Sequence, residues 1–243
     1  MPGDSKALSN PLPGIPRVLG QYQDSRPGPT LLCVAGLHGN EAPGVLALVE
    51  TLEELERRRD EMSGNLLALS GNRAALAQGK RFLHRDLNRS WSSEGLREAG
   101  SAGRTKGLED QEQTELLQTL DQTIREAQGP VFFLDLHTTS GPGHPFSIFL
   151  DSLPSRRFAL GLSVPLVFGL GELLDGTLLE YISDQGIPGA VFEAGARDDP
   201  ESIQVSRAAI WVALASAGVV KESAFPEVVE SRHRLLRRAR GLP

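Results

Sequence analysis

The sequence predicts an α/β fold, a three-layer α/β/α sandwich around a mixed, mostly parallel central sheet. Three observations lead to this class. Short apolar runs alternate with longer segments of helical pattern along most of the chain. The runs are apolar throughout rather than at every second residue, which is typical of strands buried on both faces. Turn residues lie between the two kinds of segment and limit the runs to the length of a strand.

Seven strands account for the apolar runs. The first, over 16–23, is expected at an edge of the sheet. The others are expected at 30–36, 64–72, 130–137, 145–150, 164–169 and 189–195. None of these runs approaches the ~20 apolar residues that a membrane-spanning helix needs. We therefore expect no association with a membrane.

Helical patterns lie between and after the strands. Helices are predicted at 43–59, 109–128, 154–162, 176–185 and 200–218, with a basic helix end at 231–241. Pro43 suits the first turn of its helix. The second helix has an apolar stripe formed by Leu116, Leu117, Leu120 and Ile124. Residues 73–107 are polar and irregular, and the Gly- and Ser-rich part at 92–107 predicts a surface loop.

The composition favours one domain over residues 1–243, with a loose lead-in at 1–15 and a helical tail at 225–243. A chain of 243 residues, 40% of them hydrophobic, can bury one sizeable core. The net charge of −6 argues against nucleic-acid binding, which usually needs a basic surface. The single cysteine, Cys33, lies in an expected strand, where it is predicted to be a buried small hydrophobe. A cytoplasmic protein fits best.

Polar side chains stand at the ends of several expected strands. His38 and Glu41 follow the strand at 30–36, His137 ends the strand at 130–137, and Glu193 lies near the end of the strand at 189–195. In open α/β sheets, ligands bind beyond the carboxyl ends of the strands. The convergence of these side chains therefore predicts a functional site at that edge.

The spacing of His38 and Glu41 suggests a metal site. A His-x-x-Glu pair can bind one ion, and Gly39 allows a tight turn between them. A catalytic zinc usually takes three protein ligands from His and carboxylate and leaves a fourth position for water. The third ligand must come from elsewhere in the chain, and His137 is the best candidate. We therefore expect one Zn²⁺ per chain.

A hydrolase also needs a base that takes the proton of the attacking water. Glu193, in the apolar surroundings of AVFEAG, could have the raised pKa that suits this role. Asp135 either orients a metal ligand or forms a buried hydrogen bond. The arginines in the stretch 81–89 could bind a carboxylate or stabilise negative charge on a carbonyl oxygen.

Four motifs in this order resemble the succinylglutamate desuccinylase/aspartoacylase family, part of the wider zinc carboxypeptidase-like group. They are LHGNE at 37–41, GNRAALAQGKRFLHRDLNRSW at 71–91, DLHTTSG at 135–141 and FEAG at 192–195. The resemblance covers roughly residues 30–215. It implies the same α/β/α sandwich that the strand pattern predicts.

The resemblance also implies roles for individual residues. His38, Glu41 and His137 would bind one zinc ion. Glu193 would activate water and later protonate the leaving amine, and Arg81 would polarise the scissile carbonyl. Asn88 and Arg89 would hold a substrate carboxylate. Thr138 would contact substrate, and Asp86 and residues 138–140 would support the site.

The chain departs from the family pattern in two places. Family deacylases carry a further β-rich C-terminal region that supplies a tyrosine, but only 50 residues follow Glu193 and none is a tyrosine. We expect this region to be absent. An arginine that aspartate deacylases use for the acyl carboxylate has no counterpart in the stretch 180–193. We therefore expect an acyl group that is uncharged or larger, and a more open site.

These observations predict a zinc-dependent hydrolase that cleaves the amide bond of an N-acyl amino acid or a similar small carboxylate-bearing substrate. A zinc carboxypeptidase that acts on peptides is the enzymatic alternative. A metal-free binding protein on the same scaffold is the second alternative. The sequence leaves open the acyl group, the amine, the oligomeric state, and the roles of His144 in the loop 140–145 and of the basic tail.

Overall fold

The computed structural model of this protein describes residues 12–24, 26–100 and 107–241. Seven strands form one sheet in the order β1-β3-β2-β4-β7-β5-β6. They are β1 (Val18–Tyr22), β2 (Thr30–Ala35), β3 (Asn65–Ser70), β4 (Val131–Thr139), β5 (Phe146–Ile148), β6 (Leu166–Val167) and β7 (Gly189–Ala196). All seven predicted strands are present, and the predicted edge strand is indeed β1.

The centre of the sheet is parallel and its two sides are antiparallel. β3, β2, β4 and β7 run in one direction. β1 pairs with β3, and β5 with β7, in the opposite sense. The carboxyl ends of β2, β4 and β7 therefore meet at one edge, which is where a ligand site is expected in such a sheet. The predicted mixed, mostly parallel sheet is confirmed.

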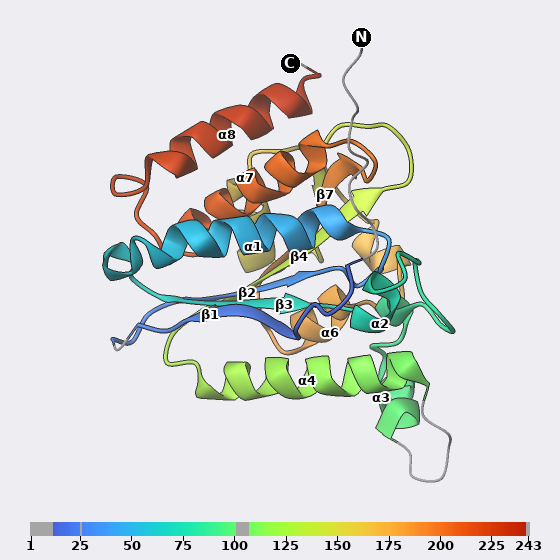
Figure 1. Ribbon diagram of the computed structural model, residues 1–243. Helices are drawn as coiled ribbons and strands as arrows, with labels where there is room; N and C mark the ends of the chain where they lie inside the picture. The colour runs from blue at the N-terminus through green and yellow to red at the C-terminus, as the bar shows by residue number, and fades with distance from the viewer. Residues whose placement is uncertain (1–11, 25, 101–106, 242–243) are drawn as a thin grey trace.

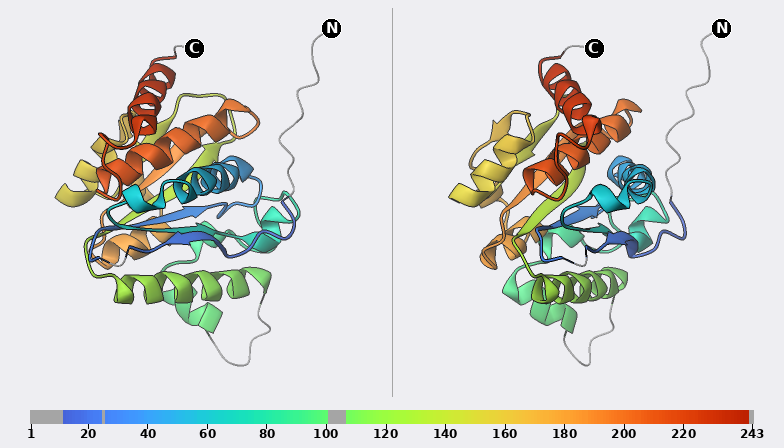
Figure 2. Two further views of the ribbon diagram at one scale, coloured as in Figure 1. Left: turned by 60° about the vertical axis from the view of Figure 1, so that its left-hand side comes forward. Right: turned by 90° about the vertical axis from the view of Figure 1, so that its left-hand side faces the viewer.

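Helices cover both faces of the sheet (Figure 1). The helices are α1 (Ala42–Glu56), α2 (Arg73–Leu76), α3 (Ser93–Gly100), α4 (Leu108–Glu126), α5 (Leu153–Gly161), α6 (Leu178–Asp184), α7 (Glu201–Ser216) and α8 (Pro226–Ala239). Short 3-10 helices form η1 (Arg59–Glu61), η2 (Leu87–Arg89) and η3 (Gly171–Leu173). In Figure 2, α1, α7 and α8 lie on one side of the sheet and α4 on the other, so the three layers are confirmed.

A hydrophobic core fills each of the two interfaces between layers. Trp211 of α7 and Phe158 of α5 belong to the core beside α1, together with the fully buried Cys33 of β2. Leu116 and Leu120 of α4 belong to the core on the opposite face. The apolar stripe predicted for this helix therefore faces the sheet, as expected. Over the described ranges, no helix combines the length and the apolar character needed to cross a membrane.

The prediction of a surface loop at 92–107 is wrong for its first part. Residues Ser93–Gly100 form α3, and residues 101–106 lie outside the described part of the chain. The Ser92 hydroxyl accepts a hydrogen bond from the Gly95 amide at 3.2 Å, and Ala99 is buried. Glycine and serine suggested a loop, but here a serine precedes the helix and supports its first turn.

The predicted loose lead-in at 1–15 also needs correction where it is described. The amide of Leu12 donates to the carbonyl of Leu76 at 2.8 Å, and Leu12 and Ile15 pack against the core. Residues 1–11 lie outside the described part. The segment directly before β1 is therefore attached to the fold.

A buried arginine joins β1 to two other elements. The guanidinium of Arg17 donates to the carbonyls of Ser70 and Gly71 and pairs with the carboxylate of Glu112 on α4. Burial is the main cause that lowers the pKa of Arg17, to about 10, and Glu112 acts in the opposite direction. Because Arg17 directly precedes β1 and its partners lie at the end of β3 and on α4, this one side chain fastens the three elements together.

Candidate metal centre and catalytic site

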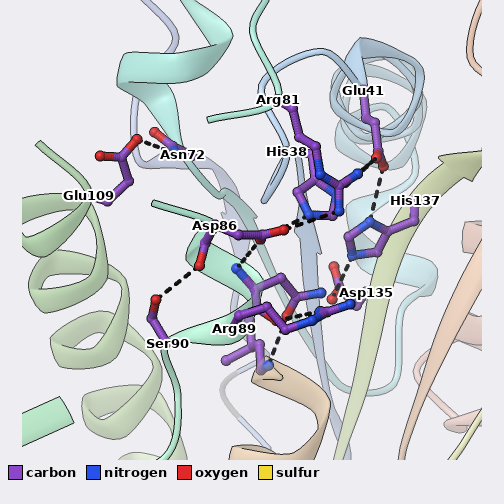
Figure 3. Close-up of polar contacts among 12 residues, drawn as sticks. His38, Glu41, Asn72, Arg81, Asp86, Arg89, Ser90, Glu109, Asp135 and His137 are labelled. Atoms are coloured by element: carbon purple, nitrogen blue, oxygen red, sulfur yellow. Dashed lines mark hydrogen bonds and ion pairs between the residues drawn. The ribbon is translucent and has the colours of Figure 1, made fainter. Parts of the chain in front are cut away.

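The three predicted metal ligands meet at the carboxyl edge of the sheet (Figure 3). His38 follows β2, Glu41 directly precedes α1, and His137 lies in β4. All three are buried, and each offers one ligand atom such that these atoms lie within 4.8 Å of one another. The side chains come together because β2 and β4 are parallel neighbours, with Ala35 paired to Leu136.

Glycines shape the turn that carries His38 and Glu41. Gly36 has a φ of +74°, a left-handed conformation that turns the chain away from β2. A Cβ at Gly39 would lie 2.1 Å from the carbonyl carbon of Ala75, so only glycine allows the turn to pack against α2. This close approach fixes the position of the two ligands relative to the strand.

The carboxylate of Glu41 lies between the two imidazoles. Its Oε1 is 2.9 Å from Nδ1 of His38, and its Oε2 is 3.0 Å from Nδ1 of His137. The backbone amide of Thr138 also donates to Oε2 at 3.0 Å. Burial raises the pKa of Glu41, but the neighbouring imidazoles lower it more strongly, so it stays well below its usual value. Glu41 is therefore held as a carboxylate.

The far nitrogen of each imidazole also faces a carboxylate. Nε2 of His38 lies 3.1 Å from Oδ1 of Asp86, and Nε2 of His137 lies 3.0 Å from Oδ2 of Asp135. Burial lowers the pKa of both histidines, yet the surrounding carboxylates raise it overall. Metal-binding histidines commonly donate their second N–H to such a carboxylate. Of the two roles predicted for Asp135, the structure therefore supports the contact with a candidate ligand.

This donor set fits zinc. Zinc is bound by imidazole nitrogen and carboxylate oxygen at about 2.0–2.2 Å, so ligand atoms around a tetrahedral ion lie roughly 3.3–3.5 Å apart. The two His–Glu separations of 2.9 and 3.0 Å are close to this range. Both Nδ1 atoms face the shared carboxylate.

Glu193 lies next to His137 across the parallel pair β4 and β7. Its Oε2 is buried, and no hydrogen-bond partner for this atom occurs in the described part of the chain. Burial is the main cause that raises the pKa of Glu193 to about 7, while the nearby His137 acts to lower it. A carboxyl group with this pKa can both accept and donate a proton at neutral pH.

Arg81 and Asp86 lie beside the candidate ligands. Asp86 bonds His38 through Oδ1 and pairs with Arg81 through Oδ2 at 3.1 Å. The second guanidinium nitrogen of Arg81 is 3.8 Å from Oε1 of Glu41. Arg81 therefore reaches the edge of the candidate metal site, and Asp86 holds it there.

Asn88 and Arg89 lie on η2, which begins directly after Asp86. The Asn88 amide donates to Oδ1 of Asp86, and the Asn88 side-chain oxygen accepts from the amide of Leu178 at 2.9 Å. Arg89 is exposed and donates to the carbonyl of Asn88 at 2.7 Å. Thr138 follows His137, and its buried hydroxyl has no partner among residues 12–24, 26–100 and 107–241.

One cavity of about 280 Å³ unites these residues. All eight predicted site residues line it: His38, Glu41, Arg81, Asn88, Arg89, His137, Thr138 and Glu193. Of the loop 140–145, Ser140 also lines the cavity, whereas His144 lies against Gly241 beyond α8.

Sequence reasoning missed the apolar part of the cavity. Ile148, Leu174, Leu179 and Val191 line it as well. Val191 precedes Glu193 by two positions on β7, so the strand period alone could have placed it on the same face. No comparable signal in the sequence identifies Leu174 or Leu179.

Sequence reasoning also missed how the stretch 81–91 is held. The buried Glu109 at the start of α4 accepts hydrogen bonds from the amides of Leu83 and His84 at 2.7 and 3.3 Å. Arg85 pairs with the buried Asp110 of the same helix at 2.8 Å. Glu109 and Asp110 therefore anchor the stretch carrying Arg81 and Arg89, a contact between distant segments that the sequence alone does not reveal.

The chain matches a known family over residues 27–238, described as the Succinylglutamate desuccinylase/Aspartoacylase catalytic domain. A succinylglutamate desuccinylase of Serratia proteamaculans (strain 568) is 33% identical over 162 residues, which is 65% of this chain and 44% of that protein. The chain thus spans less than half the length of this curated relative.

Solved structures share the fold. The succinylglutamate desuccinylase from Chromobacterium violaceum superposes with a TM-score of 0.63 at 20% identity, covering 79% of this chain and 62% of the other. A candidate metallopeptidase from Shewanella denitrificans OS217 superposes with a TM-score of 0.58 at 21% identity, covering 84% of each chain. At these identities the likeness supports the fold.

Proposed function

Because the chain belongs to the succinylglutamate desuccinylase/aspartoacylase family, we propose that it is a zinc-dependent hydrolase cleaving the amide bond of an N-acyl amino acid or a similar small carboxylate-bearing substrate. One observation carries the proposal. His38, Glu41 and His137 converge on one point, and their cavity is shared by Glu193, whose buried Oε2 has no hydrogen-bond partner among the described residues. A metal ion and a base beside it are the two requirements for hydrolysis by activated water.

His38, Glu41 and His137 would hold the ion through the two Nδ1 atoms and the shared carboxylate. Asp86 and Asp135 would keep the imidazoles oriented, since each accepts from the far nitrogen of one ring. When bound, zinc supplies a Lewis acid and makes water acidic enough to be a nucleophile near neutral pH.

Glu193 is the proposed general base and acid. Its carboxylate would take a proton from the attacking water and later give it to the nitrogen of the leaving amine. A pKa of about 7 suits both halves of this transfer, because the group changes protonation near the working pH. The protein achieves this pKa mainly by burying the side chain.

Two arginines would act on the substrate in different ways. Arg81, beside Glu41 and Asp86, would stabilise negative charge on the carbonyl oxygen of the scissile bond. Arg89, which has no carboxylate partner in the part of the chain that is described, would bind the substrate carboxylate together with Asn88. Thr138, with a free buried hydroxyl in the cavity, would hydrogen-bond the substrate.

The catalytic domain, the class of substrate and the cellular compartment are likewise proposed. The matched residues 27–238 would form a catalytic domain. With the longer Serratia relative, this chain would share the class of substrate and not the particular compound. The fully buried Cys33, with no disulfide partner, supports a protein of the reducing cytoplasm.

A zinc carboxypeptidase acting on peptides is the second candidate. Arg81 and Arg89 are both exposed at the cavity. A peptide could therefore extend out of the cavity past these arginines while its C-terminal carboxylate binds Arg89. This candidate requires the same metal and the same base.

The test measures metal content and hydrolysis together. The purified protein would be analysed for bound metal, and then offered N-acyl amino acids and short peptides with zinc present. We expect about one zinc per chain and release of free amino acid from N-acyl amino acids. Faster cleavage of peptides would favour the carboxypeptidase. A protein without metal that gains no hydrolytic activity on adding zinc would indicate a binding protein and refute the hydrolase.

A further inference from the structure

We propose that the amino-acid half of the substrate carries an apolar side chain, as in N-acyl-leucine or N-acyl-phenylalanine, rather than an acidic one. The inference rests on the proposed function and adds the substrate class. The charges that line the cavity are the first evidence for this class. Apart from the candidate metal ligands His38 and His137, the basic side chains that line the cavity within the described ranges are Arg81 and Arg89.

Only one of these two cations is free to bind an anion. Arg81 is 3.1 Å from the carboxylate of Asp86 and 3.8 Å from that of Glu41. Arg89 donates to the backbone carbonyl of Asn88 and, among the residues described, has no carboxylate partner. The cavity can therefore neutralise one carboxylate, and for an N-acyl amino acid that is the α-carboxylate.

Arg89 adjoins one particular wall of the cavity. The Asn88 side chain accepts a hydrogen bond from the amide of Leu178, and the Trp91 amide donates to the carbonyl of Gly176 at 2.9 Å. A Cβ at Gly176 would lie 2.8 Å from the carbonyl oxygen of Arg89. A substrate whose α-carboxylate binds Arg89 therefore places its side chain near the segment 174–179.

That wall is apolar. Leu174 and Leu179 come from this segment, and Ile148 and Val191 form a cross-strand pair of β5 and β7 beside it. Thr177 also lines the cavity, but its hydroxyl accepts a hydrogen bond from the Glu180 amide at 3.1 Å and caps α6.

The wall favours one class of side chain. An apolar side chain placed against it would be stabilised by the removal of apolar surface from water. A carboxylate there would lose its hydration without meeting a cation. N-succinylglutamate, with an acidic side chain on the amino acid, is therefore a poor match for this cavity.

The first measurement is a substrate comparison with the zinc-loaded protein. N-acetyl-L-leucine and N-acetyl-L-phenylalanine are compared with N-acetyl-L-glutamate, N-acetyl-L-aspartate and N-succinyl-L-glutamate. We expect kcat/KM to be at least about 10-fold higher for the apolar pair, the scale on which apolar pockets discriminate. Equal or faster hydrolysis of the acidic substrates would overturn the inference.

A matched pair of variants tests the wall itself. Leu174→Arg adds a third arginine to the cavity, and the second besides Arg89 that would be available to a carboxylate, so we expect it to lower the leucine-to-glutamate ratio of kcat/KM by about 10-fold or more. Leu173→Arg adds the same charge one residue earlier, at a side chain that is 79% exposed and does not line the cavity. This control should leave the ratio unchanged. Equal effects of both variants would indicate a general charge effect and contradict the proposed wall.

A binding measurement separates this inference from the proposed function. Calorimetric titration of Glu193→Gln with N-acetyl-L-leucine and N-acetyl-L-glutamate needs no turnover. Tighter binding of the leucine compound without any hydrolysis by the wild type would keep the specificity and refute the hydrolase. Faster hydrolysis of the glutamate compound by the wild type would support the hydrolase and refute the specificity for apolar side chains. Equal affinity, or no binding of either compound, overturns the specificity.

Discussion

Asp135 and His137 lie two positions apart on β4, and Oδ2 of Asp135 is 3.0 Å from Nε2 of His137. The strand period places both side chains on the same face of the sheet. The carboxylate of Asp135 therefore contacts the imidazole of His137, whose Nδ1 faces Glu41. Both side chains are buried. The imidazole therefore has its Nε2 committed to Asp135, which leaves Nδ1 as the nitrogen available for a metal.

Loss of this contact should weaken metal binding. Asp135→Asn keeps the size of the side chain but removes the negative charge that orients His137. We expect zinc affinity to fall about 10–100-fold, the usual effect of such partners, as measured by competition with a chromogenic chelator. Asp151→Asn, which changes an exposed ion pair with Arg156, should leave the affinity at its wild-type value. Unchanged affinity in Asp135→Asn would show that His137 needs no such partner.

Removing the proposed base should separate catalysis from metal binding. Glu193→Gln retains the shape of the side chain and leaves Glu41 and both histidines in place. We expect normal zinc content and a loss of about 10²-fold or more in kcat. His38→Ala, in contrast, should lose the metal. Full activity of Glu193→Gln would contradict its role, and normal zinc occupancy in His38→Ala would contradict the ligand assignment.

The role of Arg89 predicts a change in KM. Arg89→Ala removes the guanidinium proposed to bind the substrate carboxylate before and during reaction. We expect KM for N-acyl amino acids to rise about 10–100-fold with a much smaller change in kcat, since uniform binding is lost. Arg157→Ala, at an exposed position of α5, serves as the control. A KM equal to that of the control would place the carboxylate elsewhere.

Much of the fold could be predicted because local signals agreed with the tertiary structure. Continuous apolar runs such as 30–36 and 130–137 became β2 and β4, the buried centre of the sheet. The candidate ligands followed from these strands, since the topology brings their carboxyl ends together. His38 and His137 could therefore be paired before their distance was known.

The remainder depends on contacts between distant segments. Glu109 of α4 is buried because it accepts from the amides of Leu83 and His84, and the sequence offers no sign of this pairing. The apolar wall formed by Leu174 and Leu179 likewise results from how α6 meets η2. Ser92 lies before a helix and not in the predicted loop, and the prediction was wrong there because a serine that supports a helix start and a serine in a loop look the same in the sequence.

The buried carboxyl of Glu193 should make the metal-free protein sensitive to pH. Burial raises its pKa from the ordinary value of 4.5 to about 7 in the folded state. Between these values the folded state binds more protons than the unfolded state, so the free energy of unfolding falls as pH rises through this window. Above about pH 7 the ionised carboxylate lowers the free energy of unfolding by its full amount, about 1–3 kcal/mol.

The measurement compares wild type and Glu193→Gln by urea unfolding after chelation of metal, from pH 5 to 8. The glutamine cannot ionise, so its stability relative to wild type should increase steadily with pH. Any constant offset reflects the buried amide itself and not the titration. A difference that does not vary with pH would show that Glu193 has an ordinary pKa in the folded protein.

Arg17 should contribute more to stability than an exposed arginine in an ion pair. Arg17→Met removes the donor to two backbone carbonyls and the partner of the buried Glu112. We expect unfolding free energy to fall by about 3–5 kcal/mol, as for a buried pair that loses one member. In Arg26→Met, which removes a 69% exposed side chain paired with Asp24, the loss should stay below about 1 kcal/mol. Urea denaturation measures both, and equal losses would mean that Arg17 does not fasten β1 to α4.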